Sequence, residues 1–193
     1  NIKSDFTCFG KGMGNGLPIS AISGPKEFMK IFDKLWVSST NNPETLSIAG
    51  TIAVINEMRE RKTISHCWST GKKLFEGWNK ISESHNLDVK MIGYPIRMNL
   101  ECYDSNQKKS DSLKAIILQE MIKKGIFFSP GVNFISYSHT SQDIELTLKA
   151  LEDICNEIKT KAPNEKYEKL LEGHMPKTVW TMKISPTKKR SIK

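Results

Sequence analysis

The sequence predicts an α/β fold in which amphipathic helices and short strands are joined by polar turns. Hydrophobic residues recur every three to four positions over several stretches, as they do on one face of a helix. Met98, Leu100 and Cys102 instead alternate with polar residues, which is the pattern of a half-buried strand. With 193 residues, of which 38% are hydrophobic, the chain has enough apolar side chains to form a core.

The amino-terminal part predicts two short strands around a glycine-rich loop. Residues 6–9 form a β-prone run, and the glycines at positions 10, 12, 14 and 16 then specify neither a helix nor a strand. Such a loop lets a ligand or another backbone come close. A second strand is expected over residues 17–24, followed by a helix over about residues 25–34 with Phe28, Met29 and Phe32 inward.

A long helix is expected after the polar turn at residues 38–43. Asn42 is the expected N-cap and Pro43 the first helical residue, and an apolar stripe follows that includes Leu46 and Ile52. A further helix over about residues 64–83 carries several aromatic side chains, for which packing is the expected role.

From residue 88 onward the predicted order is strand, strand, helix, strand, loop, helix. This order indicates a compact α/β unit with a mainly antiparallel sheet. Residues 126–129 are expected to be a strand, and Gly125 to end the helix before it. Thr140 and Asp143 resemble a capping box for a helix that runs to about residue 160. A short helix is expected to end near Gly173, before a disordered tail.

The composition argues against several classes of partner. Much of the formal net charge of +8 lies on scattered lysines and in residues 183–193, so a solvated surface with a basic tail is favoured over a nucleic-acid-binding face. The four cysteines lack metal-ligand spacing, which predicts reduced thiols and no metal site. No apolar run approaches the roughly 20 residues that span a bilayer, and no signal peptide is recognisable. A cytoplasmic protein is therefore expected, with neither nucleic acid nor membrane as a partner, and the start at Asn1 suggests a fragment.

Lys11 is the lysine that lies among the glycines directly after a short strand. A lysine that forms a Schiff base needs close approach to a flat cofactor and a depressed pKa, so that neutral amine is available. The glycine spacing fits neither a P-loop nor a dinucleotide-binding loop. From the residues alone, a cofactor-binding loop and a plain flexible turn both remain open.

Other polar residues are weaker candidates. His139 precedes a helix, and a loop histidine that orders the start of the helix is favoured over an acid or base. Arg97 could bind a substrate carboxylate, but a surface role is favoured. The remaining histidines, His66, His85 and His174, are expected to be exposed to solvent.

Residues 5–21, which contain Asp5, Lys11, the glycines and Pro18, resemble the pyridoxal-phosphate lysine segment of class III aminotransferases. Within that family they are most similar to the glutamate-1-semialdehyde 2,1-aminomutase-like branch. Residues 38–47 resemble the segment whose threonine reaches the cofactor phosphate of the neighbouring subunit. Residues 122–128 and 136–144 resemble the small carboxy-terminal domain, and residues 170–176 its closing segment, so the resemblance covers about residues 1–180.

The resemblance implies the pyridoxal-phosphate-dependent transferase fold type I, of which the chain would hold the end of the large domain and the small α/β domain. Residues 1–62 would carry the cofactor lysine and an interface helix, and residues 63–87 would form a connecting helix. Residues 88–162 would be the small domain, and residues 163–193 the carboxy-terminal segment with its basic tail.

The resemblance also implies an activity. Pyridoxal 5'-phosphate would be the cofactor, with Lys11 as the catalytic Schiff-base residue and Thr40 as a phosphate ligand, although Thr40 could instead only cap the helix. The expected enzyme is an aminotransferase that takes a small amino donor and acceptor, an amino acid or an amino-sugar-like or keto substrate, and forms a homodimer when full length. The alternatives are an aminomutase of the glutamate-1-semialdehyde type and a truncated, inactive fragment, because the family's other cofactor-binding residues precede the lysine.

Overall fold

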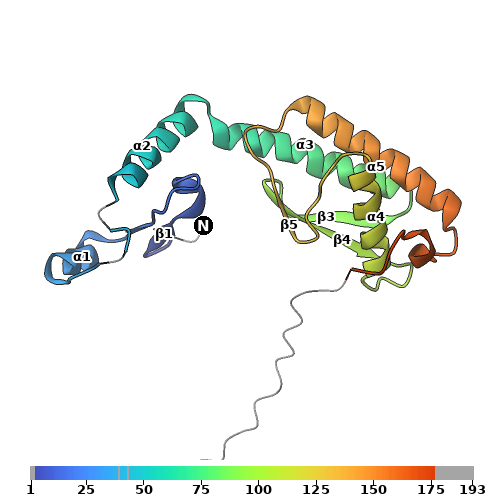
Figure 1. The fold of residues 1–193 in the computed structure, drawn as a ribbon, viewed down its shortest axis with the longest axis horizontal. Coiled ribbons are helices and arrows are strands. Elements are labelled where there is room, and N and C mark those ends of the chain that lie inside the picture. The colour runs from blue at the N-terminus through green and yellow to red at the C-terminus, as the bar shows by residue number, and fades with distance from the viewer. Residues whose placement is uncertain (1–2, 39, 43, 177–193) are drawn as a thin grey trace, which may run out of the picture. The chain divides into compact units, whose positions relative to one another are not determined.

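The computed structural model describes residues 3–38, 40–42 and 44–176. These residues belong to two compact units, the first within residues 1–67 and the second within residues 68–193. Figure 1 labels their helices and strands.

The first unit begins with a β-hairpin. Strands β1 (Thr7–Phe9) and β2 (Ala21–Ser23) pair antiparallel, with Cys8 opposite Ile22. The connection contains the short 3-10 turn η1 (Lys11–Met13), which backbone hydrogen bonds close. The two predicted strands are present, and the second is shorter than residues 17–24.

The helix expected over residues 25–34 consists of two short pieces, α1 (Lys26–Met29) and η2 (Lys30–Lys34). Phe28 and Phe32 are 55% and 40% exposed, so the prediction that they point into a core was wrong. Phe28 contacts the ring of Phe6, with 5.9 Å between the ring centroids, but much of its surface stays exposed.

Helix α2 (Thr45–Glu60) begins later than predicted. Its N-cap is Glu44, whose carboxylate accepts hydrogen bonds from the amides of Leu46 and Ser47, so the prediction of Asn42 as the cap was wrong. Pro43 lies outside the described residues. Leu46 in the expected apolar stripe is 65% exposed, which shows that this part of the stripe does not face a core.

The second unit contains a three-stranded antiparallel sheet with the order β3-β4-β5, formed by β3 (Asp88–Tyr94), β4 (Arg97–Tyr103) and β5 (Val132–Phe134). The predicted order of elements from residue 88 is confirmed. The third strand lies after residues 126–129 because the side chain of Asn133 bonds both the N–H and the C=O of Ser129. These backbone groups are therefore already paired within the loop.

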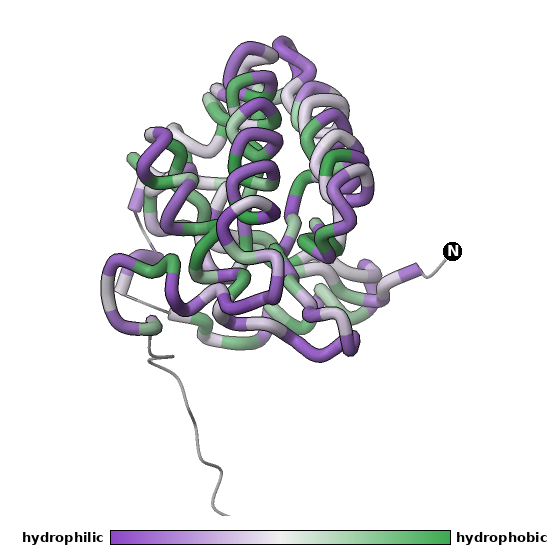
Figure 2. Tube along the Cα trace, turned by 90° about the vertical axis from the view of Figure 1, so that its right-hand side faces the viewer, coloured by the Kyte–Doolittle hydropathy of each residue, from purple (hydrophilic) through white to green (hydrophobic). Residues whose placement is uncertain are grey.

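Helices α3 (Thr63–Ser84), α4 (Asp111–Lys123) and α5 (Ser141–Lys161) contribute side chains to the core on one face of the sheet. Met98, Leu100 and Cys102 of β4 are buried there, as their alternation predicted. Helices α3 and α5 run side by side in Figure 1, and Leu148 packs where Gly77 has no side chain. Figure 2 shows how hydrophobic and hydrophilic residues alternate along the helices, as expected for helices that bury one face.

Side chains of α3 hydrogen-bond the outer edge of β3, which is an edge strand. The indole Nε1 of Trp78 donates to the Val89 carbonyl at 2.9 Å, and the hydroxyl of Ser82 accepts from the Val89 amide at 3.0 Å. Asn79 donates from Nδ2 to the Met91 carbonyl at 3.1 Å and accepts from the Met91 amide at 2.8 Å. These bonds pair backbone groups that an edge strand would otherwise leave open to another chain.

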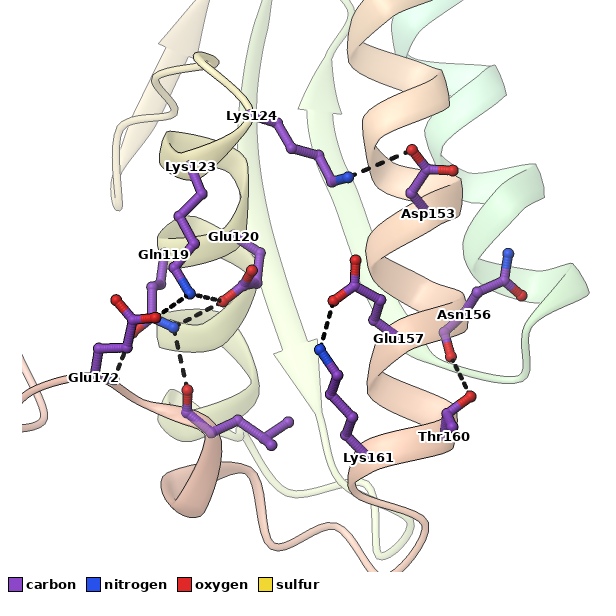
Figure 3. Close-up of polar contacts among 11 residues, drawn as sticks. Gln119, Glu120, Lys123, Lys124, Asp153, Asn156, Glu157, Thr160, Lys161 and Glu172 are labelled. Carbon is purple, nitrogen blue, oxygen red and sulfur yellow. Dashed lines mark hydrogen bonds and ion pairs between the residues drawn. The ribbon is translucent and has the colours of Figure 1, made fainter.

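The carboxy-terminal segment is held on α4 (Figure 3). Gln119 donates to the Leu170 carbonyl at 3.2 Å and accepts from the Glu172 amide at 2.9 Å, while Lys123 pairs with Glu120 and Glu172. The 3-10 turn η3 (Tyr167–Leu170) buries Tyr167. The tail that the sequence predicts to be disordered lies largely outside the described residues.

Both helix ends predicted in the second unit are confirmed. Thr140 and Asp143 form the capping box of α5, in which each side chain accepts from the other residue's amide. Gly125 follows α4 with a φ of 79°, a left-handed conformation that glycine adopts without strain. Within the described residues, no helix combines the length and the hydropathy needed to cross a membrane.

Candidate functional site

Lys11 is the first residue of η1 and follows β1 and Gly10 directly. Its φ is 50°, in the left-handed region, which costs an L-residue about 1–2 kcal/mol. The residue is exposed, and among the described residues its amine makes no hydrogen bond or ion pair. The fold thus presents a free primary amine on a strained turn at the end of a strand.

Thr40 lies in the turn before α2 and is exposed. It does not cap the helix, because Glu44 does, and this excludes the simple capping role that the sequence left open. Hydrogen bonds from Ser47 and Leu46 lower the pKa of the Glu44 carboxyl, although partial burial opposes the shift. The amides of Leu46 and Ser47 are therefore not available to an anion, and any phosphate contact at this turn must use the Thr40 hydroxyl or earlier groups.

An open cavity of about 690 Å³ lies in the first unit between the hairpin and the start of α2. Its walls include Phe9, Ile19 and Ile22 on one side and Asn41, Asn42 and Ser47 on the other. Lys11 and Thr40 are not in its lining, although Phe9 and Asn41 are close to them in the chain. The structure thus brings the chain neighbours of the two predicted site residues to one cavity.

In the second unit, His139 and His85 make hydrogen bonds that indicate structural roles. His139 accepts a hydrogen bond at Nδ1 from the Ser136 amide at 3.0 Å, as expected for a histidine that orders its loop. His85, expected to be exposed, is half-buried, and its Nε2 lies 3.1 Å from the Asn156 side-chain oxygen on α5, so that prediction was wrong. Arg97 is exposed on the sheet face opposite the helices, in register with Tyr94 and Phe134.

The two buried thiols are protonated and therefore poor nucleophiles at neutral pH. Burial raises the pKa of the Cys102 and Cys155 thiols to about 12, so neither is a thiolate at neutral pH. All four cysteines are free, as the sequence predicts. In the part of the chain that the structure describes, no cluster of histidine, cysteine and carboxylate side chains is suited to a metal ion.

Sequence reasoning missed two features of the candidate site. The role of Glu44 as the N-cap of α2 could have been predicted, because an acidic residue directly before a helix suits the positive end of the helix dipole. The left-handed conformation of Lys11 could not have been predicted, because lysine is not a residue that favours positive φ.

Solved structures share this fold. A β-phenylalanine aminotransferase from Variovorax paradoxus superposes with a TM-score of 0.72 at 20% identity, over 83% of this chain and 40% of that one. The FumI protein of Sphingopyxis sp. MTA144, in its PLP internal aldimine form, superposes with a TM-score of 0.71 at 23% identity, over 83% and 38%. These neighbours confirm the predicted fold class.

Curated relatives are also similar in sequence. A glutamate-1-semialdehyde 2,1-aminomutase from Clostridium novyi (strain NT) is 28% identical over 172 residues, which cover 82% of this chain and 40% of the relative. A 3-aminobutyryl-CoA aminotransferase from Cloacimonas acidaminovorans (strain Evry) is 26% identical over 160 residues, which cover 82% and 39%. The chain thus spans about two fifths of the length of these relatives.

The sequence matches the family described as Aminotransferase class-III over residues 1–155. This match includes the hairpin with Lys11, the turn with Thr40 and the sheet of the second unit. The chain belongs to the class-III aminotransferase family.

Proposed function

We propose that the full-length protein is a pyridoxal-phosphate-dependent aminotransferase in which Lys11 binds the cofactor. The observation that carries the proposal is the exposed Lys11 amine on its left-handed turn, within the segment that matches the family. Two of the solved neighbours are described as containing PLP, which supports the same cofactor here.

The described residues fit this cofactor chemically. An aldehyde needs a primary amine that is not tied up in an ion pair, and Lys11 supplies one. A phosphate needs hydrogen-bond donors, and the exposed Thr40 hydroxyl is one, because Glu44 and not Thr40 caps α2. Both features are located in the first unit.

When bound, the cofactor supplies an aldehyde that takes up amines and a ring that accepts electron density from the adjacent carbon. Lys11 would hold the cofactor through its primary amine Nζ. The same amine, when it is not attached to the cofactor, would accept a proton from the substrate carbon and return it at a different atom. Lys11 would thus be both the anchor and the proton carrier.

Thr40 is proposed to bind the cofactor phosphate of a second subunit, and the full-length protein is proposed to be a homodimer. The apolar side chains of α2 that are exposed here, including Leu46 and Ile52, support the proposal that another protein surface covers this helix in a larger assembly. Four free cysteines support a reducing compartment such as the cytoplasm.

A glutamate-1-semialdehyde-type aminomutase is the second candidate function, because one of the curated relatives described above has this activity in its name. An aminotransferase needs a separate amino acceptor, whereas an aminomutase moves the amino group within one molecule. Turnover of the full-length protein with and without an added keto acid separates the two.

The test uses full-length protein, Lys11→Ala and Lys11→Arg. After incubation with pyridoxal phosphate and removal of the unbound cofactor, the wild-type protein is expected to show a near-visible absorbance band, and both variants to lose it. Lys11→Arg keeps the charge but removes the primary amine, so it distinguishes covalent attachment from electrostatic attraction. A band that persists in both variants would exclude Lys11 as the attachment point.

A further inference from the structure

We infer that Gly14 is a positioning residue for Lys11: because position 14 has no side chain, the turn closes against Leu17 and Ile19 and so holds Lys11 in its left-handed conformation. The inference rests on the proposed role of Lys11 and adds a second residue to the same site.

Gly14 is the buried glycine of the loop, whereas Gly12 and Gly16 are exposed. A Cβ atom at position 14 would lie 2.5 Å from the carbonyl oxygen of Leu17 and 2.7 Å from Cγ2 of Ile19. The first of these atoms belongs to the backbone and cannot move aside by a change of rotamer. Any side chain at position 14 therefore has to shift the turn itself.

The clash is purely steric. Gly14 has a φ of −95° and a ψ of −8°, which an alanine also adopts, so substitution brings no conformational penalty of its own. An alanine at this position thus tests close approach alone.

Hydrogen bonds connect Gly14 to Lys11 directly. The Gly14 amide donates to the Lys11 carbonyl at 3.1 Å, and the Leu17 amide donates to the Gly14 carbonyl at 3.1 Å. Gly14 is thus the bridge between the lysine and Leu17. A strained φ persists only where its surroundings enforce it, and here the enforcing contacts pass through Gly14.

Leu17 is itself anchored on α2. A Cβ atom at Gly50 would lie 2.2 Å from Cδ1 of Leu17, which shows that the leucine side chain lies directly against the helix backbone at this glycine. Because Leu17 is held on a 16-residue helix, a clash between positions 14 and 17 displaces the lysine side of the turn more easily than the leucine side.

Gly12 provides the matched control. It lies next to Lys11 and is exposed, and a Cβ atom there would meet no described atom within 4 Å apart from its two neighbours in the chain. Gly12→Ala and Gly14→Ala add the same methyl group two residues apart, and only the second is expected to move the turn.

The experiment compares full-length wild-type protein with Gly14→Ala, Gly12→Ala and Lys11→Ala. The first two measurements are the dissociation constant of pyridoxal phosphate and the midpoint of the pH titration of the absorbance band. The third uses cofactor-free protein and follows, by mass spectrometry, how fast a water-soluble acetylating reagent modifies the Lys11 amine. Gly14→Ala is expected to weaken cofactor binding roughly 10- to 100-fold, to shift the titration midpoint and to change the labelling rate of Lys11. Gly12→Ala is expected to match the wild type in all three.

A merely structural role for Gly14 would lower the melting temperature but leave the titration midpoint and the Lys11 labelling rate at wild-type values, and this result would overturn the inference. Should Gly14→Ala fail to fold, Leu17→Ala is the second variant, because it removes the anchor without adding atoms. It is expected to shift the same quantities in the same direction as Gly14→Ala. Unchanged values in Leu17→Ala would equally refute the inference. If instead Lys11→Ala keeps the absorbance band, the proposed function fails, and the two failures are thus distinguishable.

Discussion

Replacing Asn79 by alanine is expected to destabilise the second unit by freeing the edge of β3. The side chain makes two hydrogen bonds, to the amide and the carbonyl of Met91, at 2.8 and 3.1 Å. Each bond contributes about 1 kcal/mol, and unpaired backbone groups at a partly buried edge add to the loss. We therefore expect the free energy of unfolding to fall by about 2–3 kcal/mol.

Denaturant unfolding of the full-length protein measures this loss, and hydrogen exchange of the Met91 amide locates it. Asn79→Asp keeps an acceptor for the Met91 amide but no donor for its carbonyl, so an intermediate loss is expected. Lys80→Ala, on the neighbouring exposed residue, is the control, for which a change within about 0.5 kcal/mol is expected. If Asn79→Ala costs no more than Lys80→Ala and Met91 exchanges at its wild-type rate, the reasoning about the strand edge is refuted.

Three further predictions concern the helix ends, the carboxy-terminal segment and the lysine turn. Thr140→Ala removes the cap of α5 and is expected to lower the free energy of unfolding by about 1 kcal/mol in denaturant unfolding. Thr140→Ser keeps the hydroxyl and is expected to keep most of the stability. Equal losses in the two variants would contradict the capping role. Burial raises the pKa of Glu120, but hydrogen bonds from Lys123 and Gln119 outweigh it, and the net pKa lies below 4.5. The stabilisation by this carboxylate is therefore present above pH 4.5 and is lost as the pH falls below it. The protection of the Glu172 amide against hydrogen exchange, taken relative to the intrinsic exchange rate at each pH, should therefore fall in acid, and Glu120→Gln should weaken that dependence. A protection that stays constant in acid would contradict the assignment. In cofactor-free protein, Lys11→Gly should be more stable than Lys11→Ala by about 1 kcal/mol, because glycine adopts the φ of 50° without strain; a more stable alanine variant in thermal unfolding would argue against the strained turn.

Local patterns predicted the second unit well. The alternation in β4 and the capping box of α5 depend on neighbouring residues, and both are present as expected. The bonds from Asn79 to Met91 join residues 12 positions apart and belong to no short motif, so no local pattern predicts them. β5 was misplaced because a run of four residues is too short to separate a strand from a loop that Asn133 holds together.

In the first unit, periodicity predicted which residues share a face but not what covers that face. Phe28, Phe32 and Leu46 follow helical spacing, yet all three are exposed. The same limit applies to the candidate site. The glycine pattern and the family resemblance singled out Lys11. Its left-handed φ and the close approach at Gly14 are visible only in the three-dimensional structure.

The most direct test of the account is reduction of the full-length protein with borohydride in the presence of pyridoxal phosphate, followed by peptide mass spectrometry. We expect the cofactor-derived mass on the peptide that contains Lys11 and no comparable label in Lys11→Arg. Label on a different lysine, or unlabelled Lys11 in protein that retains the absorbance band, would contradict the central claim.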